Sequence, residues 1–184
     1  MLPRTVYVAF LSVFLLLCDN YHPNAQTQKL DELFLELKDA ENEQVAKTED
    51  SIWNEWRKSG SDSVDYLLER GMVAMNAGQL NLAVRHFTAV IEQAPEFAEG
   101  YNMRATTYYL MQRFGLSVAD IEQTLNLNPR HFGAMSGLGL IFEATNRPEE
   151  ALVIYQKVLE LHPQSAQAQA AAQRLEATLE GTKL

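Results

Sequence analysis

The sequence predicts an all-α fold in which helical hairpins repeat and stack into a solenoid. Pro95, Pro129 and Pro163 are equally spaced (129 − 95 = 34 and 163 − 129 = 34), and each interval holds two stretches with the apolar spacing of amphipathic helices. Helix breakers separate the two stretches, and the turns are expected at Asn76–Gly78, near Arg113–Gly115 and at Asn146–Pro148. Aligned on the prolines, the repeat units span 64–97, 98–131 and 132–165. Units of this length share a continuous core with their neighbours.

The first 25 residues have the layout of a secretory signal peptide. A positively charged start precedes an uncharged run, 5–18, whose fourteen residues would span about 21 Å as a helix, short of a ~30 Å bilayer core. Polar residues follow, and cleavage is plausible after Ala25. An uncleaved membrane anchor through 5–18 and lipidation at Cys18 are the alternatives. We therefore expect an exported protein, most simply a periplasmic one.

Residues 26–62 are expected to form capping helices before the first repeat. Leu30, Leu33, Phe34 and Leu37 define one apolar helix face, and a second helix from about residue 43 to 58 carries both tryptophans, Trp53 and Trp56. The tryptophans are interpreted as covering the exposed end of the first repeat, with an aromatic docking site as the alternative. After the repeats, 166–184 is expected to form a C-terminal capping helix with a short tail.

Small and large side chains recur at fixed positions inside the three units. Position eight holds Gly71, Ala105 and Gly139, and position twenty-four holds Phe87, Ile121 and Tyr155. A small residue opposite a bulky one lets the two helices of a hairpin pack closely, so we expect these positions to face each other. In the second unit, Arg104 at position seven and Asp120 at position twenty-three predict a partly buried ion pair.

This pattern resembles the tetratricopeptide repeat (TPR), a 34-residue helix-turn-helix unit. The third unit fits best, with Met135, Leu138, Gly139, Phe142, Ala151, Tyr155 and Pro163. With its leader and tryptophan-bearing helix, the whole chain looks like short exported TPR proteins of alphaproteobacteria. The resemblance implies a three-repeat TPR solenoid that acts as a non-catalytic scaffold or adaptor for other proteins.

The resemblance also implies a binding groove on the concave surface made by the first helices of the units. The groove residues it assigns here are Leu68, Met72, Met75, Asn102, Thr106, Tyr109, Leu140 and Glu143. The groove-facing positions of the three units together are apolar in the middle with the carboxylates of Asp65, Glu99 and Glu143 at the edge, which suits a protein or peptide segment with apolar anchors and basic flanks. In the alternative interpretation, the N-terminal helices cover Leu68, Met72 and Met75.

Several function classes are disfavoured. The chain has 15 Lys and Arg against 24 Asp and Glu, a net charge of 15 − 24 = −9, which argues against nucleic acid and anionic lipid as partners. We find no catalytic, cofactor-binding or metal-binding motif. Family members that grip a chaperone's C-terminal carboxylate use cationic residues, whereas the corresponding positions here are Leu68, Met72, Ser136 and Leu140. A client-holding assembly factor of the cell envelope, of the cytochrome-maturation or pilus-biogenesis type, remains an alternative; an enzyme with a site in 26–62 is a weaker one.

Overall fold

The computed structural model describes residues 25–41 and 43–181, and these ranges contain helices and no strand. The helices are α2 (Ala25–Asp39), α3 (Glu43–Trp56), α4 (Asp62–Asn76), α5 (Leu80–Gln93), α6 (Ala98–Leu110), α7 (Phe114–Leu127), α8 (Phe132–Ala144), α9 (Pro148–Leu161) and α10 (Ala166–Gly181). The predicted all-α class is therefore confirmed. The leader lies, apart from Ala25, outside the described residues. None of the described helices combines the length and apolar character needed to cross a membrane.

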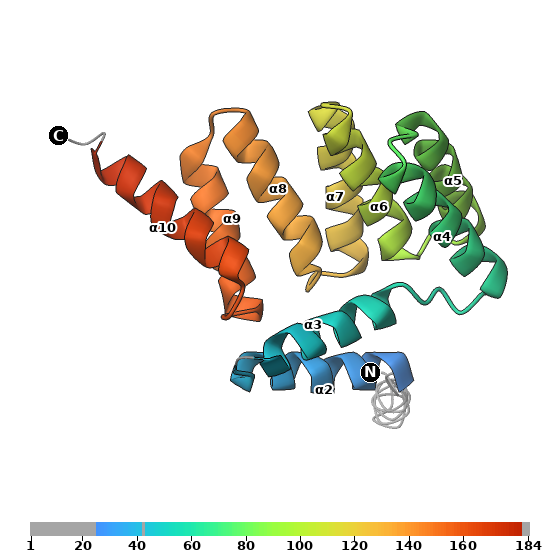
Figure 1. Cartoon of the computed structure of the whole chain (residues 1–184), viewed down its shortest axis with the longest axis horizontal. Helices are drawn as coiled ribbons and strands as arrows, with labels where there is room; N and C mark the ends of the chain where they lie inside the picture. The colour runs from blue at the N-terminus through green and yellow to red at the C-terminus, as the bar shows by residue number, and fades with distance from the viewer. Residues whose placement is uncertain (1–24, 42, 182–184) are drawn as a thin grey trace, which may run out of the picture.

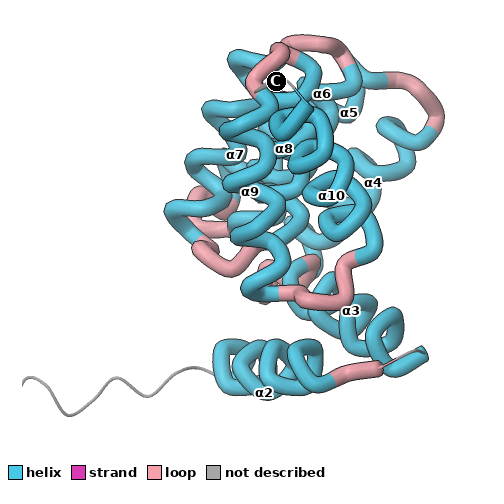
Figure 2. Tube along the Cα trace, turned by 90° about the vertical axis from the view of Figure 1, so that its left-hand side faces the viewer, coloured by secondary structure: helices cyan, strands magenta, loops and turns pink. Residues whose placement is uncertain are grey.

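The six helices of the repeat region form three hairpins that stack side by side. α4 pairs with α5, α6 with α7 and α8 with α9, and α10 packs on α9 at the end of the stack (Figure 1). The first helices α4, α6 and α8 are neighbours along one side of the stack. The side view in Figure 2 places α2 and α3 below the stacked hairpins.

The predicted pairing of small and large residues closes the hairpins. A Cβ atom on Gly71 would lie 2.4 Å from the Phe87 ring, and one on Gly139 would lie 2.8 Å from the Tyr155 ring. Phe87 and Tyr155 are fully buried. Because no side chain larger than hydrogen fits at these two glycines without moving a buried ring, the aromatic residue sets the distance between the helices.

The turns between paired helices share one backbone feature at the same position of each repeat unit. Gly78 has φ 71°, and both Gln112 and Asn146 have φ 57°. These residues adopt the left-handed conformation that lets the chain reverse after a helix. The expected turn near Gly115 lies slightly too far along the chain, because α7 already begins at Phe114 and Gly115 belongs to its first turn.

The C-terminal helix α10 is fastened to the third hairpin by polar contacts as well as by its apolar face. Arg174 Nη1 lies 2.6 Å from Glu143 Oε2, and the Tyr155 hydroxyl donates to Glu143 Oε1 at 2.9 Å. The Arg174 guanidinium, with help from the Tyr155 hydroxyl, lowers the pKa of the Glu143 carboxyl below its usual value. Ala168, Ala172 and Leu175 of α10 are buried, as expected of a cap.

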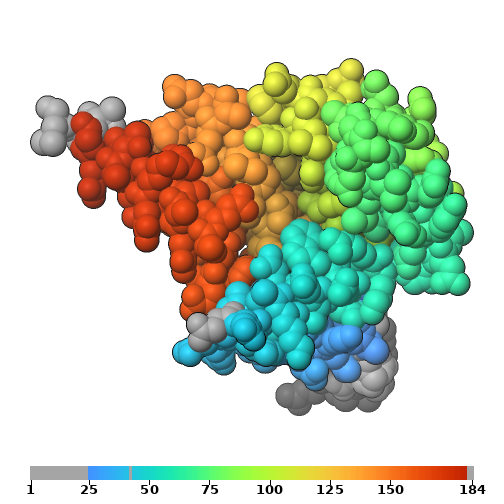
Figure 3. All heavy atoms as spheres, in the orientation of Figure 1, coloured from blue at the N-terminus to red at the C-terminus, as the bar shows by residue number. Residues whose placement is uncertain are grey.

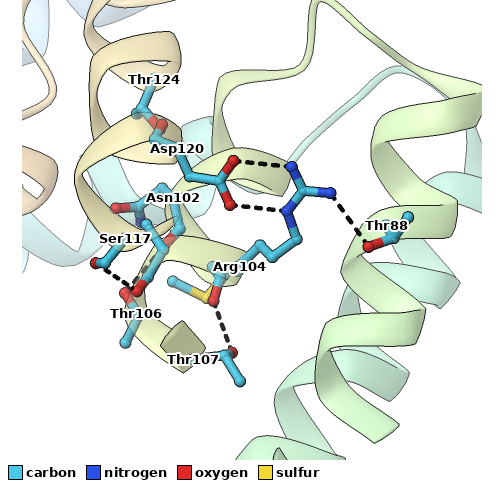
Figure 4. A network of polar contacts seen from close by, with 10 residues as sticks. Thr88, Asn102, Arg104, Thr106, Thr107, Ser117, Asp120 and Thr124 are labelled. Carbon is cyan, nitrogen blue, oxygen red and sulfur yellow. Dashed lines mark hydrogen bonds and ion pairs between the residues drawn. The ribbon is translucent and has the colours of Figure 1, made fainter. Parts of the chain in front are cut away.

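The predicted ion pair of the second hairpin is present and bidentate (Figure 4). Arg104 Nε donates to Asp120 Oδ2 at 2.7 Å, and its Nη2 donates to Oδ1 at 2.8 Å. Arg104 Nη1 also donates to Thr88 Oγ1 on α5, at 3.1 Å. The Asp120 hydrogen bonds raise the pKa of the guanidinium. The pair therefore ties α6 to α7 and also to the preceding hairpin.

The expectation that 26–62 covers the free end of the first repeat is wrong. Phe34 and Trp56 belong to the apolar cluster of Phe132 and Tyr155, and none of the residues in the first hairpin's cluster comes from α2 or α3. The end of the first repeat stays open, and Tyr66 on α4 is 60% exposed. The physical reason is an aromatic site at the start of α8, which binds the tryptophans and is described below.

We predict that Asp120→Ala destabilises the protein more than the double change Arg104→Leu/Asp120→Ile. The single change leaves the half-buried guanidinium without its carboxylate and should lower the free energy of unfolding by about 2 kcal/mol. The double change copies the apolar residues Leu138 and Ile154 of the third unit and should cost less than half as much. Urea denaturation followed by circular dichroism measures both, with Glu122→Ala on the exposed side of α7 as the control. Equal losses for the single and double variants would contradict the prediction.

Candidate functional site

The N-terminal hairpin of α2 and α3 is held together by a buried carboxylate. Glu55 of α3 is 5% exposed and pairs with Lys29 of α2 and, at 2.8 Å, with Lys58. Hydrogen bonds from Lys29 and Lys58 lower the pKa of Glu55. The Lys29–Glu55 pair thus ties α2 to α3, and another face of α3 meets the repeats.

That face docks on an aromatic site at the junction of the second and third repeats. The Trp56 ring stacks on His131 with centroids 4.1 Å apart and planes 18° from parallel. Trp53 contacts Phe132 edge-on, with centroids 5.6 Å apart. Trp53 also lies directly over Gly133, where a Cβ atom would come within 2.3 Å of its ring. A glycine inside a helix thereby permits the close approach of the indole.

His131 organises this junction from a fully buried position. Its Nδ1 accepts a hydrogen bond from the backbone N–H of Ala134 and caps α8, so its Nε2 carries the hydrogen and donates to Glu99 Oε2 at 2.9 Å. The Asn102 amide donates to the same carboxylate oxygen at 3.1 Å. One imidazole therefore links the starts of α6 and α8 and supports Trp56 on its face.

Docking of the hairpin leaves a hollow between α3 and the first helices of the second and third repeats (Figure 3). We call it the groove cavity; its volume is about 280 Å³. Its walls are Glu49 and Trp53 of α3, Asn102, Thr106 and Tyr109 of α6, Gly133, Ser136, Gly137 and Leu140 of α8, His162, Ser165 and Gln167 at the α9–α10 corner, and Ala105, Ser117, Ile121, Phe132 and Ala134 beneath.

The structure brings half of the predicted groove residues together. Asn102, Thr106, Tyr109 and Leu140 all line the groove cavity. Glu143 does not, because its carboxylate is engaged by Tyr155 and Arg174.

The predicted groove residues of the first unit lie elsewhere. Leu68 is 2% exposed in the core of the first hairpin, so its assignment to a binding surface is wrong. Met72 and Met75 pack against the same core, and Met75 Sδ accepts from Thr107 Oγ1 at 3.4 Å. The alternative interpretation, in which the N-terminal helices cover these residues, fails as well, because those helices belong to another apolar cluster.

Two walls of the cavity could not be assigned from the repeat pattern. Glu49 and Trp53 lie outside the repeats, and His162, Ser165 and Gln167 lie at the corner where α9 meets α10. Gly133 was the available signal, since a glycine at a groove-facing position of a helix marks close approach of another chain segment.

The lining of the groove cavity mixes apolar residues with hydroxyl and amide groups. Its lining contains one carboxylate, that of Glu49, and no Lys or Arg. His162 is the other residue of the lining that can carry a charge. Burial lowers the pKa of His162, which favours its neutral form. Among the described residues, no group of three or more His, Cys, Asp or Glu side chains could hold a metal ion. This chemistry suits recognition of a chain segment by shape and hydrogen bonds.

Stacked helical hairpins whose first helices lie side by side define a helical repeat scaffold. A family model described as Tetratricopeptide repeat matches residues 102–166. A TPR repeat-containing protein of Rhizobium etli is 31% identical over 157 residues, which cover 85% of this chain and 77% of that protein. The chain therefore belongs to the tetratricopeptide repeat family and resembles its alphaproteobacterial members.

Further matches extend the family relationship to proteins of other sizes and to solved structures. The Saccharomyces cerevisiae small glutamine-rich tetratricopeptide repeat-containing protein 2 is 31% identical over 70% of this chain, which is 35% of the yeast protein. The first TPR domain of Spaghetti (RPAP3), solved with the HSP90 peptide SRMEEVD, is 25% identical with a TM-score of 0.61, covering 64% of this chain and 93% of that one. MamA shares the fold, with a TM-score of 0.60 at 17% identity over 77% of this chain and 86% of its own.

We predict that Gly133→Ala loosens the docking of α3 while leaving the repeats folded. The added methyl group would meet the Trp53 ring at 2.3 Å, whereas alanine itself favours the helix by about 1 kcal/mol relative to glycine. Because both tryptophans of the chain lie in α3, their fluorescence should shift to longer wavelength and become more accessible to acrylamide, with little change in circular dichroism. Gly137→Ala on the same helix is the control, since its methyl group would lie 3.7 Å from Ile121. Equal spectra for the two variants would contradict the prediction.

Proposed function

We propose that this chain is a non-catalytic protein-interaction module that binds an extended segment of a partner protein in the groove cavity. The TPR family and its peptide-binding structures support an interaction role. The observation that carries the proposal is the convergence of Asn102, Thr106, Tyr109 and Leu140 from two successive repeats on one open hollow. Tyr109 offers contact area with few rotatable bonds, and the half-buried Thr106 hydroxyl, which donates to the Asn102 carbonyl, can still accept a hydrogen bond from a peptide N–H.

The proposed partner segment differs from the HSP90 peptide bound to the Spaghetti domain. That peptide ends in EEVD and is acidic. Here the residues that face the groove cavity include no cation, and Glu49 would repel a carboxylate. The partner segment is therefore apolar and neutral or basic.

We also propose that the protein is exported to the periplasm, on the evidence of the leader-like sequence 1–25. An interaction module in that compartment would serve as a scaffold or adaptor. Holding unfolded clients during envelope assembly is the second candidate, which the apolar side chains Ile121, Phe132 and Leu140 in the lining of the groove cavity favour. Export predicts that the chain isolated from cell envelopes begins at Gln26, a result that N-terminal sequencing shows directly. A protein found in the cytoplasm that starts at Met1 would contradict this part of the proposal.

We predict that Tyr109→Glu or Leu140→Glu weakens peptide binding. Peptides are first selected with the wild-type chain from a random linear library, and their affinities are then measured by calorimetry. A carboxylate inserted in the groove cavity loses apolar contact and stays poorly solvated when a peptide covers it, so affinity should fall at least about tenfold.

Tyr66→Glu provides the matched control for this experiment. Tyr66 is also an aromatic residue of a first helix, but it is 60% exposed and lies outside the groove cavity. Its substitution should leave peptide affinity unchanged. The proposal fails if the library yields no binder, or if all three variants, each folded by circular dichroism, bind like the wild type.

A further inference from the structure

A second hollow continues the groove cavity past the end of the repeats. We call it the corner cavity; it has a volume of about 520 Å³ and lies between α3 and the start of α10. Its lining residues are Val45, Ala46, Glu49, His162, Gln164, Ser165, Ala166 and Gln167. Four of them, Glu49, His162, Ser165 and Gln167, also line the groove cavity. The two hollows therefore meet at a shared polar wall.

The shared wall contains a polar atom that the fold leaves without a partner. His162 is 3% exposed, and its Nε2 is buried with no hydrogen bond in the described part of the chain. A buried polar atom without a hydrogen-bond partner is unfavourable. Because this atom lies in the wall of a cavity, a polar group of a ligand could supply the missing hydrogen bond. Its neighbours are the Phe132 ring, 5.3 Å away between centroids, and the Glu49 carboxylate, whose charge acts on the imidazole.

Glu49 is held in position to act on both cavities. Trp53 Nε1 donates to Glu49 Oε1 at 3.3 Å, and no other described residue donates to this carboxylate. Neither cavity is lined by a Lys or Arg that could neutralise it. The Arg57 guanidinium lies 5.8 Å from the centroid of the Trp53 ring, but Arg57 lines neither cavity. The wall therefore carries a net negative charge beside an apolar groove.

We propose that Glu49 and His162 form a subsite for a Lys or Arg side chain of the partner segment, next to the apolar anchor that occupies the groove cavity. This inference rests on the proposed function and names the class of segment: an apolar residue followed or preceded by a cation. The cation pairs with the Glu49 carboxylate, and a neighbouring amide or hydroxyl group of the segment donates to His162 Nε2 or accepts from it. Specificity for the basic residue thus comes from α3, outside the repeats.

The test compares libraries selected on the full wild-type chain and on Glu49→Lys. Peptides from the wild type should combine apolar residues with Lys or Arg, and those from Glu49→Lys should carry Asp or Glu instead. Asp50→Lys is the matched control, since the next residue of α3 is exposed and lines neither cavity, and it should select the same peptides as the wild type.

A double-mutant cycle then localises the contact. Replacing the selected Lys or Arg by Gln should weaken binding to the wild type about tenfold and have little further effect on Glu49→Gln. His162→Phe, which keeps the ring in the wall and removes the nitrogen, should weaken binding of the same peptides.

The outcomes separate this inference from the proposed function. Binders that need Tyr109 and Leu140 but show no preference for a cation overturn the Glu49–His162 subsite and leave the groove standing. A library without binders overturns both. A stable dimer that is lost in Glu49→Lys, and that peptides do not dissociate, overturns the subsite in favour of a second copy of the chain.

Discussion

The close approach of a buried aromatic ring to a glycine on the facing helix is the constraint on which the stack depends. Gly71 against Phe87 and Gly139 against Tyr155 bring the helices of the first and third hairpins into contact closer than any Cβ atom would allow. In the second hairpin, Ala105 and Ile121 share one cluster, and Ser117 Oγ donates to the Ala105 carbonyl at 2.8 Å. Each hairpin is rigid because its two helices interlock, and a rigid stack is what fixes the groove residues of α6 and α8 relative to one another.

Features that repeat along the sequence could be predicted, because each is local to a unit. The helices, the facing positions eight and twenty-four, and the Arg104–Asp120 pair all follow from side-chain spacing within a single repeat. The turn of the second unit was misplaced because Gly115 suggested a break. Gly78 and Asn146 occupy the same position of their repeat units, and the equivalent residue of the second unit is Gln112. Gln112 has the same left-handed φ, but because it is not a glycine the sequence does not indicate a turn there.

Features that join distant segments could not be predicted from the period. The hairpin of α2 and α3 docks on a site that lies beyond the whole first repeat and most of the second, where Trp56 meets His131. Amphipathicity shows that α3 must bury its tryptophans, but several apolar surfaces would satisfy that requirement. The choice is made by aromatic complementarity at His131 and Phe132, and by the absence of a side chain at Gly133, none of which belongs to the repeat pattern. The misassignment of Leu68 has a different origin, since this residue follows the family pattern of the groove yet is buried in the core of its own hairpin.

The docked hairpin changes what the repeats can bind. In an open stack, the concave surface would extend across all three first helices. In this chain Trp53 of α3 covers Gly133 of the third repeat, while Met72 and Met75 of the first are half-buried against the core of their own hairpin, so the concave surface narrows to the corner cavity and the adjoining groove cavity of about 280 Å³. A cavity of that size accommodates only a few side chains, which favours a short motif over a long helix. Because Glu49 and Trp53 line the cavity from outside the repeats, changes in α3 could alter specificity while every helix–helix contact of the stack is retained.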